Sequence, residues 1–315
     1  MGSLAVAALL FAAYLLGAGG PHSTPTLSIV LPAAETATVA DDGTSAAGAA
    51  AALAPTGAVA TPPAPPSPQA IDSEWEKRSV PVAIANGRAL VAVIIDDMGL
   101  DRAKGLRVIG LMPPLTLSFL PYGRDAPALA ILARQRGHEV LLHMPMQPLG
   151  REDPGPQALT TDLTAIEIRT RVGAALDRFG DAIGLNNHMG SRFTAERTLM
   201  LPVMEELAAR GLVFVDSRTG TASEAIPVAA ERGVPAALRD VFLDNDVAPA
   251  AIAKQLEEAE RVARRRGAAI AIGHPHDATL AALAQWLPGL AERGLQAVPV
   301  SAVLRRAALR GNATR

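Results

Sequence analysis

Between residues 89 and 300, short apolar runs alternate with longer segments of helical period, and this alternation restricts the possible folds more than any other feature. The runs have no polar alternate face, which is typical of parallel strands covered on both sides of a sheet. Eight strands are predicted, at 89–95, 115–119, 139–143, 182–186, 212–216, 240–244, 268–273 and 296–300.

Helical segments separate these strands, and glycines such as Gly137, Gly211 and Gly267 follow them as C-terminal caps do. The helices are predicted near 101–111, 125–136, 162–179, 195–210, 222–232, 249–267, 278–292 and 301–311. Such repetition predicts an α/β fold, a distorted (β/α) barrel of seven or eight parallel strands. An open doubly wound sheet is the alternative. The sequence contains no GxGxxG or P-loop pattern that would favour a nucleotide site.

The first 78 residues differ in composition from the rest. Residues 4–18 form an apolar run without charge, so we expect residues 1–20 to be a signal peptide or a membrane anchor. Residues 21–78 are rich in Ala, Pro, Thr, Ser and Gly, which predicts a disordered linker ahead of a folded domain at 79–315. We therefore expect an exported domain, periplasmic or anchored to the outer face of the inner membrane.

Composition excludes several kinds of site. The chain has no cysteine, so disulfides and thiolate metal sites are ruled out, and His, Asp and Glu remain as the strong metal ligands. The net charge is −2 and aromatic residues make up 3% of the chain, so we expect no nucleic-acid partner. The sequence carries no signal for an oligomeric state.

Polar residues gather at the predicted carboxyl ends of the strands, where parallel α/β proteins place their chemistry. They are Asp96, Asp97, Ser118, His143, Asn186, Asn187, His188, Asp216, Ser217, Arg218, Asp244, Asn245, Asp246 and His274. Imidazoles with a carboxylate suit Zn²⁺ or a similar divalent ion that keeps a position open for water. In the adjacent pair, one aspartate could bind the metal while the other takes a proton from that water. His138, at the opposite end of its strand, is predicted to be structural.

Six segments resemble a known family, the divergent polysaccharide deacetylases, which are distant relatives of the NodB-type carbohydrate esterases. These segments appear in the family's order, and the resemblance extends over essentially all of residues 88–300: VAVIIDDMG, LTLSFLPY, GHEVLLHMPMQP, GLNNHMGSRFT, FVDSRT and AIAIGHPHDAT. The resemblance implies a polysaccharide-deacetylase-like barrel and metal-dependent removal of acetyl groups from glycans.

By position, the resemblance implies that Asp96 is the catalytic base, that Asp97 and His143 are metal ligands, and that His274 is the late catalytic histidine. The family's second metal histidine would stand four residues after His143, where this chain has Gln147. Glutamine is a poor zinc ligand. We infer that His188 supplies the missing imidazole from the next strand.

The resulting hypothesis is a metal-dependent hydrolase that deacetylates a cell-envelope polysaccharide or amino-sugar glycan. Six residues are candidate substrate contacts: Tyr122, Asn186, Asn187, Arg192, Asp216 and His276. The alternative, favoured by Gln147, is a catalytically inactive glycan-binding or regulatory module on a tether. Metal-assisted hydrolysis of a phosphoester or an amide would use similar ligands and stays open.

Overall fold

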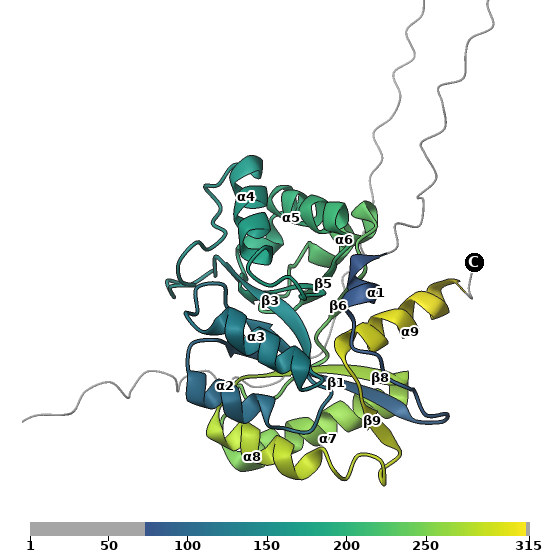
Figure 1. Ribbon diagram of the computed structural model, residues 1–315. Coiled ribbons are helices and arrows are strands. Elements are labelled where there is room, and N and C mark those ends of the chain that lie inside the picture. Colours follow the sequence, from purple (N-terminus) through teal and green to yellow (C-terminus); the bar gives the residue numbers. More distant parts are fainter. Residues whose placement is uncertain (1–72, 313–315) are drawn as a thin grey trace, which may run out of the picture. The chain divides into compact units, whose positions relative to one another are not determined.

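The computed structural model describes residues 73–312, which form a curled parallel sheet surrounded by helices (Figure 1). The order along the sheet is β6-β5-β4-β3-β2-β1-β8-β7, and β9 pairs with the start of β1. The strands are β1 (Ala89–Met98), β2 (Thr116–Phe119), β3 (Glu139–Met146), β4 (Gly184–Met189), β5 (Val213–Asp216), β6 (Ala236–Leu238), β7 (Val241–Phe242), β8 (Ala268–Gly273) and β9 (Leu295–Ala297). The predicted distorted (β/α) barrel is confirmed.

Helices follow most strands, as the alternation predicts. They are α1 (Glu74–Arg78), α2 (Arg102–Ile109), α3 (Ala126–Gln135), α4 (Ala165–Leu176), α5 (Arg197–Arg210), α6 (Ala225–Arg232), α7 (Pro249–Arg266), α8 (Asp277–Trp286) and α9 (Val300–Asn312), with a short 3₁₀ turn at Phe193–Ala195. Helix α4 begins later than predicted because Thr164 and Glu167 form a reciprocal capping box at its first turn.

Alternating residues of β1 face two separate hydrophobic clusters. Val91, Val93 and Ile95 pack outward against the surrounding helices. Leu90, Ala92 and Ile94 face the barrel interior, together with Trp75 of α1 and Leu304 of α9. Because both faces are buried, the strand reads as a continuous apolar run in the sequence.

The segment 236–242 joins the two edges of the sheet. The Arg239 amide donates to Asp216 O of β5, and the next amide, that of Asp240, donates to Ile270 O of β8, both at 2.9 Å. The strand predicted over 240–244 is present only as the two residues of β7, and β6 was not predicted, because the chain bends here from one edge of the sheet to the other. The last predicted strand, 296–300, ends early because α9 begins at Val300.

The N-terminal predictions are only partly covered by the described residues. Helix α1 precedes the boundary that we placed at residue 79, and its Trp75 is buried in the inner cluster. Within 73–312, no helix has the length and apolar character needed to cross a bilayer. The predicted leader at 1–20 and the linker up to residue 72 lie outside the described residues.

A buried carboxylate holds α9 in the barrel. Glu139, the first residue of β3, accepts hydrogen bonds from Val80 N (3.3 Å), Thr116 Oγ1 (3.3 Å) and Ser301 N (3.1 Å). Ser301 lies in the first turn of α9, where backbone amides lack helical partners. Burial raises the pKa of Glu139 above its usual value.

We expect Glu139→Ala to destabilise the domain by about 2–4 kcal/mol, since it strands these buried donors and leaves a cavity. Urea unfolding followed by circular dichroism measures the change. The exposed Glu292→Ala is the matched control and should stay within about 0.5 kcal/mol of wild type. Equal stability of Glu139→Ala and wild type would contradict this role.

Candidate metal centre and active site

A β-bulge at the end of β1 creates the site. Ile95 pairs with Leu117 and Met98 with Phe119, so β1 carries one extra residue over this interval. Ile95 and Met98 both pack in the outer cluster. Asp96 and Asp97 therefore lie between two outward-facing residues, and Asp97 has a left-handed backbone with φ 56°. Both carboxylates consequently reach the same end of the barrel.

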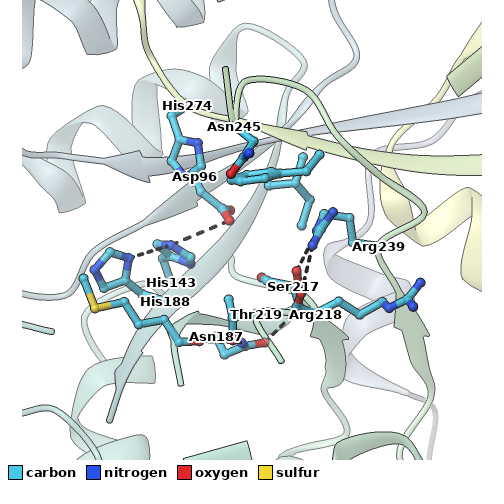
Figure 2. Close-up of a pocket in the computed structure, with 13 residues that line it drawn as sticks. Asp96, His143, Asn187, His188, Ser217, Arg218, Thr219, Arg239, Asn245 and His274 are labelled. Atoms are coloured by element: carbon cyan, nitrogen blue, oxygen red, sulfur yellow. Dashed lines mark hydrogen bonds and ion pairs between the residues drawn. The ribbon is translucent and has the colours of Figure 1, made fainter. Parts of the chain in front are cut away.

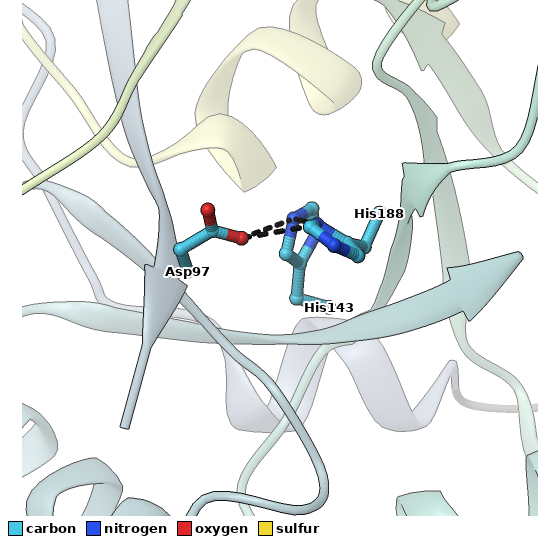
Figure 3. A group of neighbouring side chains, drawn as sticks. All are labelled: Asp97, His143 and His188. Atoms are coloured by element: carbon cyan, nitrogen blue, oxygen red, sulfur yellow. Dashed lines mark hydrogen bonds and ion pairs between the residues drawn. The ribbon is translucent and has the colours of Figure 1, made fainter. Parts of the chain in front are cut away.

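Three side chains from three strands meet at this point (Figure 3). Asp97 Oδ1 lies 3.0 Å from His188 Nδ1 and 3.4 Å from His143 Nε2. The two imidazole nitrogens are 3.2 Å apart. These residues come from β1, β3 and β4, and the structure brings the three predicted ligands together.

The dimensions of this triad fit a metal ion. Zinc bonds of about 2.0–2.1 Å place the ligand atoms of a tetrahedral site about 3.3–3.4 Å apart, close to the separations found here. Asp97 Oδ1 is buried and accepts no well-aligned hydrogen bond within the described residues, despite the nearby nitrogens. Burial would raise the pKa of Asp97, but the two imidazoles outweigh it and hold that pKa well below its usual range. The three atoms thus favour a cation between them.

Asn186 sets the orientation of His143. Its Oδ1 accepts from Ser118 Oγ at 2.5 Å and from His143 Nδ1 at 2.9 Å. Its Nδ2 donates to Asp96 Oδ1 at 2.8 Å and to Ser217 Oγ at 3.1 Å. Because His143 Nδ1 carries the proton of this bond, Nε2 presents a lone pair to the triad.

Asp96 is a buried carboxylate beside the triad. Its Oδ2 lies 3.6 Å from His143 Nε2 without forming part of the ligand triangle. Burial raises the pKa of Asp96, an effect that the charges of His143 and His274 partly offset. A carboxylate with a raised pKa is suited to accept a proton near neutral pH.

On the opposite side of Asp96, His274 pairs with Asp244. His274 Nδ1 lies 2.9 Å from Asp244 Oδ1, and Asp244 Oδ2 accepts from His274 N and Thr279 Oγ1. Although burial lowers it, the pKa of His274 is raised to about 9, chiefly by the Asp244 hydrogen bond and then by the charge of Asp96. His276 is near enough to form a second potential ligand group with these two residues. Both Asp244 oxygens already accept hydrogen bonds, so we interpret His274 as a proton donor and Asp244 as the carboxylate that keeps it protonated, rather than as two metal ligands.

Four of these side chains, those of Asp96, His143, His188 and His274, line a cavity of about 410 Å³ (Figure 2). Asp96, His143, His188 and His274 lie on one side of it, and Arg239 lies on the other. Its lining comprises Asp96, His143, Asn187, His188, Met189, Ser217, Arg218, Thr219, Arg239, Phe242, Asn245, Ile272 and His274. The volume is within the range of small-molecule sites, about 300–1,000 Å³.

The candidate substrate contacts have different positions. Asn187 lines the cavity, but its amide is engaged with Ser217 N and Met189 O. Tyr122 lines a neighbouring hollow of about 250 Å³, and His276 lines another of about 160 Å³, next to Asp97.

Three further candidates lie away from the cavity. Asn186 is completely buried beneath the triad. Asp216 is buried, and its Oδ1 accepts from the Arg218 amide. Arg192 is exposed and belongs to the lining of none of the described cavities.

Gln147 is not part of the triad. Its Oε1 accepts from Thr161 N at 2.8 Å, and its carbonyl accepts from the Arg192 and Phe193 amides. It therefore joins two loops next to the site, while His188 occupies the third corner of the triad. His138 is structural as predicted, since it is buried, with Nδ1 bonded to Leu115 N and Nε2 to Ile109 O.

Two residues of the site, Asp244 and Arg239, were not among the predicted catalytic, metal-binding or substrate-binding residues. Asp244 ends a predicted strand with polar residues, which was a signal, but only the fold brings it to His274. Arg239 had no sequence signal, because it lies in the bend between β6 and β7 that the apolar pattern did not reveal.

Comparisons with known proteins agree with this architecture. The model of the divergent polysaccharide deacetylase family matches residues 93–304. An uncharacterized protein of Haemophilus influenzae is 36% identical over 202 residues, which cover 64% of this chain and 72% of that protein. The uncharacterized protein YibQ of Escherichia coli is 36% identical over 200 residues, covering 64% of this chain and 63% of YibQ, so the match spans less than two thirds of YibQ.

One solved structure resembles this chain in both fold and sequence. The crystal structure of an uncharacterized protein of Agrobacterium tumefaciens superposes with a TM-score of 0.71 at 32% identity, covering 73% of this chain and 94% of that one. The chain therefore belongs to the divergent polysaccharide deacetylase family.

Proposed function

We propose that this protein is a metal-dependent hydrolase that removes acetyl groups from an amino-sugar glycan of the cell envelope. The observation that carries the proposal is the triad of Asp97, His143 and His188, whose ligand atoms lie 3.0–3.4 Å apart beside a second, buried carboxylate. Three protein ligands with an open fourth position are typical of catalytic zinc. Zinc or a similar first-row divalent ion is the metal we expect.

Asp97, His143 and His188 would hold the divalent ion, which would supply Lewis-acid polarisation of the acetyl carbonyl and activation of a water molecule. Asp96, next to the triad but outside it, would accept the proton of that water. His274, kept protonated by Asp244, would donate a proton to the departing amine or alcohol. Asn186 would position two of these groups at once, since it binds both His143 and Asp96.

We also propose that the protein acts in the cell envelope. The apolar run at 4–18 and the Ala/Pro-rich stretch after it support export to the periplasm or the outer face of the inner membrane. An acetylated glycan of the cell envelope would then be the substrate.

We expect the purified full chain to bind about one divalent metal per molecule, and His188→Ala to weaken metal affinity by at least about 100-fold, because it removes one of three ligands. Elemental analysis and competition with a zinc chelator measure this. Gln147→Ala is the control and should keep the metal, with circular dichroism to verify folding. Loss of metal in Gln147→Ala but not in His188→Ala would contradict the assignment.

We expect acetate release from N-acetylated amino-sugar oligomers by the metal-loaded chain, and a loss of at least about 100-fold in Asp96→Asn, because the base is removed. Metal content should stay unchanged in this variant, since Asp96 lies outside the ligand triangle. Glycan binding without acetate release in wild type would instead support the tethered glycan-binding module.

We expect the loss of activity at high pH to follow the deprotonation of His274. Its pKa of about 9 means that the proton donor is lost, and the rate falls, as pH rises through about 9. Asp244→Asn removes the negative charge that helps to raise this pKa and leaves at most a neutral hydrogen bond, so the loss of activity should move to lower pH. Proton NMR titration of His274 in metal-free protein checks the same shift without activity. The neighbouring Asp246→Asn should leave both unchanged.

A further inference from the structure

The cavity beside the triad carries more positive than negative charge. Its charged lining sets Arg218 and Arg239 against the single carboxylate of Asp96, because the charge of His274 is already matched by Asp244. A partly enclosed cavity of one predominant sign raises the local concentration of ligands of the opposite sign. A neutral acetylated sugar would make no use of this excess.

Arg239 is held in a fixed orientation by neutral groups. Its Nε donates to Ser217 O at 2.6 Å, and its Nη2 donates to Arg218 O at 2.9 Å. The guanidinium also lies over the ring of Phe242, 4.8 Å from the centroid. These contacts engage one edge of the guanidinium and leave the edge formed by Nη1 and Nη2 for a bidentate ligand.

Within the described residues this guanidinium forms no ion pair, and the carboxylates of Asp96 and Asp216 attract it only from beyond ion-pair distance. The ion pairs among residues 73–312 include neither Arg239 nor Arg218, although most of the Arg239 side chain is sheltered from water. Burial, and then the charge of Arg218, lowers the pKa of Arg239. A partly desolvated cation without an anionic partner is costly unless a ligand supplies that partner.

Arg218, at the rim of the cavity, has a strained backbone conformation. Arg218 has φ 51°, a left-handed conformation that glycine adopts at no steric cost. Its amide is held by Asp216 Oδ1 at 2.8 Å and its carbonyl by Arg239. Strain of this kind gathers at functional sites, where surrounding contacts enforce it.

Figure 2 places Arg239 across the cavity from His143 and His188. We propose that the glycan bound here carries an anionic group, a carboxylate or a phosphate, which Arg239 binds in bidentate fashion with Arg218 at the rim, while its acetyl group lies at the triad. The identity of the ligand as a glycan rests on the proposed function. The anion site itself does not require catalysis.

Calorimetric titration of the metal-free full chain tests the site, because removing the metal prevents phosphate from binding at the triad. The probes are N-acetylglucosamine, its 6-phosphate, N-acetylmuramate as the carboxylate form, and inorganic phosphate. We expect at least one acidic sugar to bind about 10- to 100-fold more tightly than the neutral sugar, as a charge-assisted pair implies, and to weaken as salt is added. The acidic sugar that binds more tightly shows whether the preferred anion is a phosphate or a carboxylate.

Arg239→Gln should abolish the preference for the acidic sugar, and Arg218→Gln, an exposed position that does not endanger folding, should reduce it several-fold. The exposed Arg136→Gln is the matched control and should keep the preference. Equal affinity for acidic and neutral sugars, no binding of any anionic probe at millimolar concentration, or a preference that survives both variants would overturn the proposal. Anion preference without acetate release would leave this site standing and refute the deacetylase activity instead.

Discussion

The left-handed backbone of Asp97 is the constraint on which the site depends. In a regular strand, Asp96 and Asp97 would point to opposite faces, and only one could reach the barrel interior. The bulge adds one residue, so Ile95 and Met98 both stay in the outer core while two carboxylates share one end of the strand. Aspartate tolerates a positive φ better than most residues, which lowers the cost.

Similar strain recurs at other strand ends around the cavity. Met189, directly after His188, has φ 52°, and Arg218, directly after Ser217, has φ 51°. With Asp97, three non-glycine residues in this conformation therefore border one site. The sheet makes such strain sustainable, because β1, β4 and β5, which carry or precede these residues, are each paired with a strand on both sides.

The buried amide of Asn186 links the two halves of the proposed chemistry. With two accepted and two donated hydrogen bonds, it makes every bond that its side chain can make in this setting. It fixes the tautomer of His143, and it gives Asp96 one neutral donor that does not cancel its charge. The sequence places Asn186 at a strand end. Whether it contacts substrate or positions other side chains depends on whether neighbouring strands bury it, which the sequence does not reveal.

The sequence by itself determined the parallel strands, their helices and the gathering of polar residues at the strand ends, because apolar periodicity and strand polarity are local properties that parallel topology converts into proximity. The choice of Asp97, His143 and His188 among those residues came from the family resemblance. Only the tertiary structure decided that segment 236–242 bends between two sheet edges, and hence that Arg239 enters the cavity. The pairing of Asp244 with His274 was likewise decided there. The physical reason is that such bends and pairings arise from hydrogen bonds between distant segments, which leave no periodic trace in the chain.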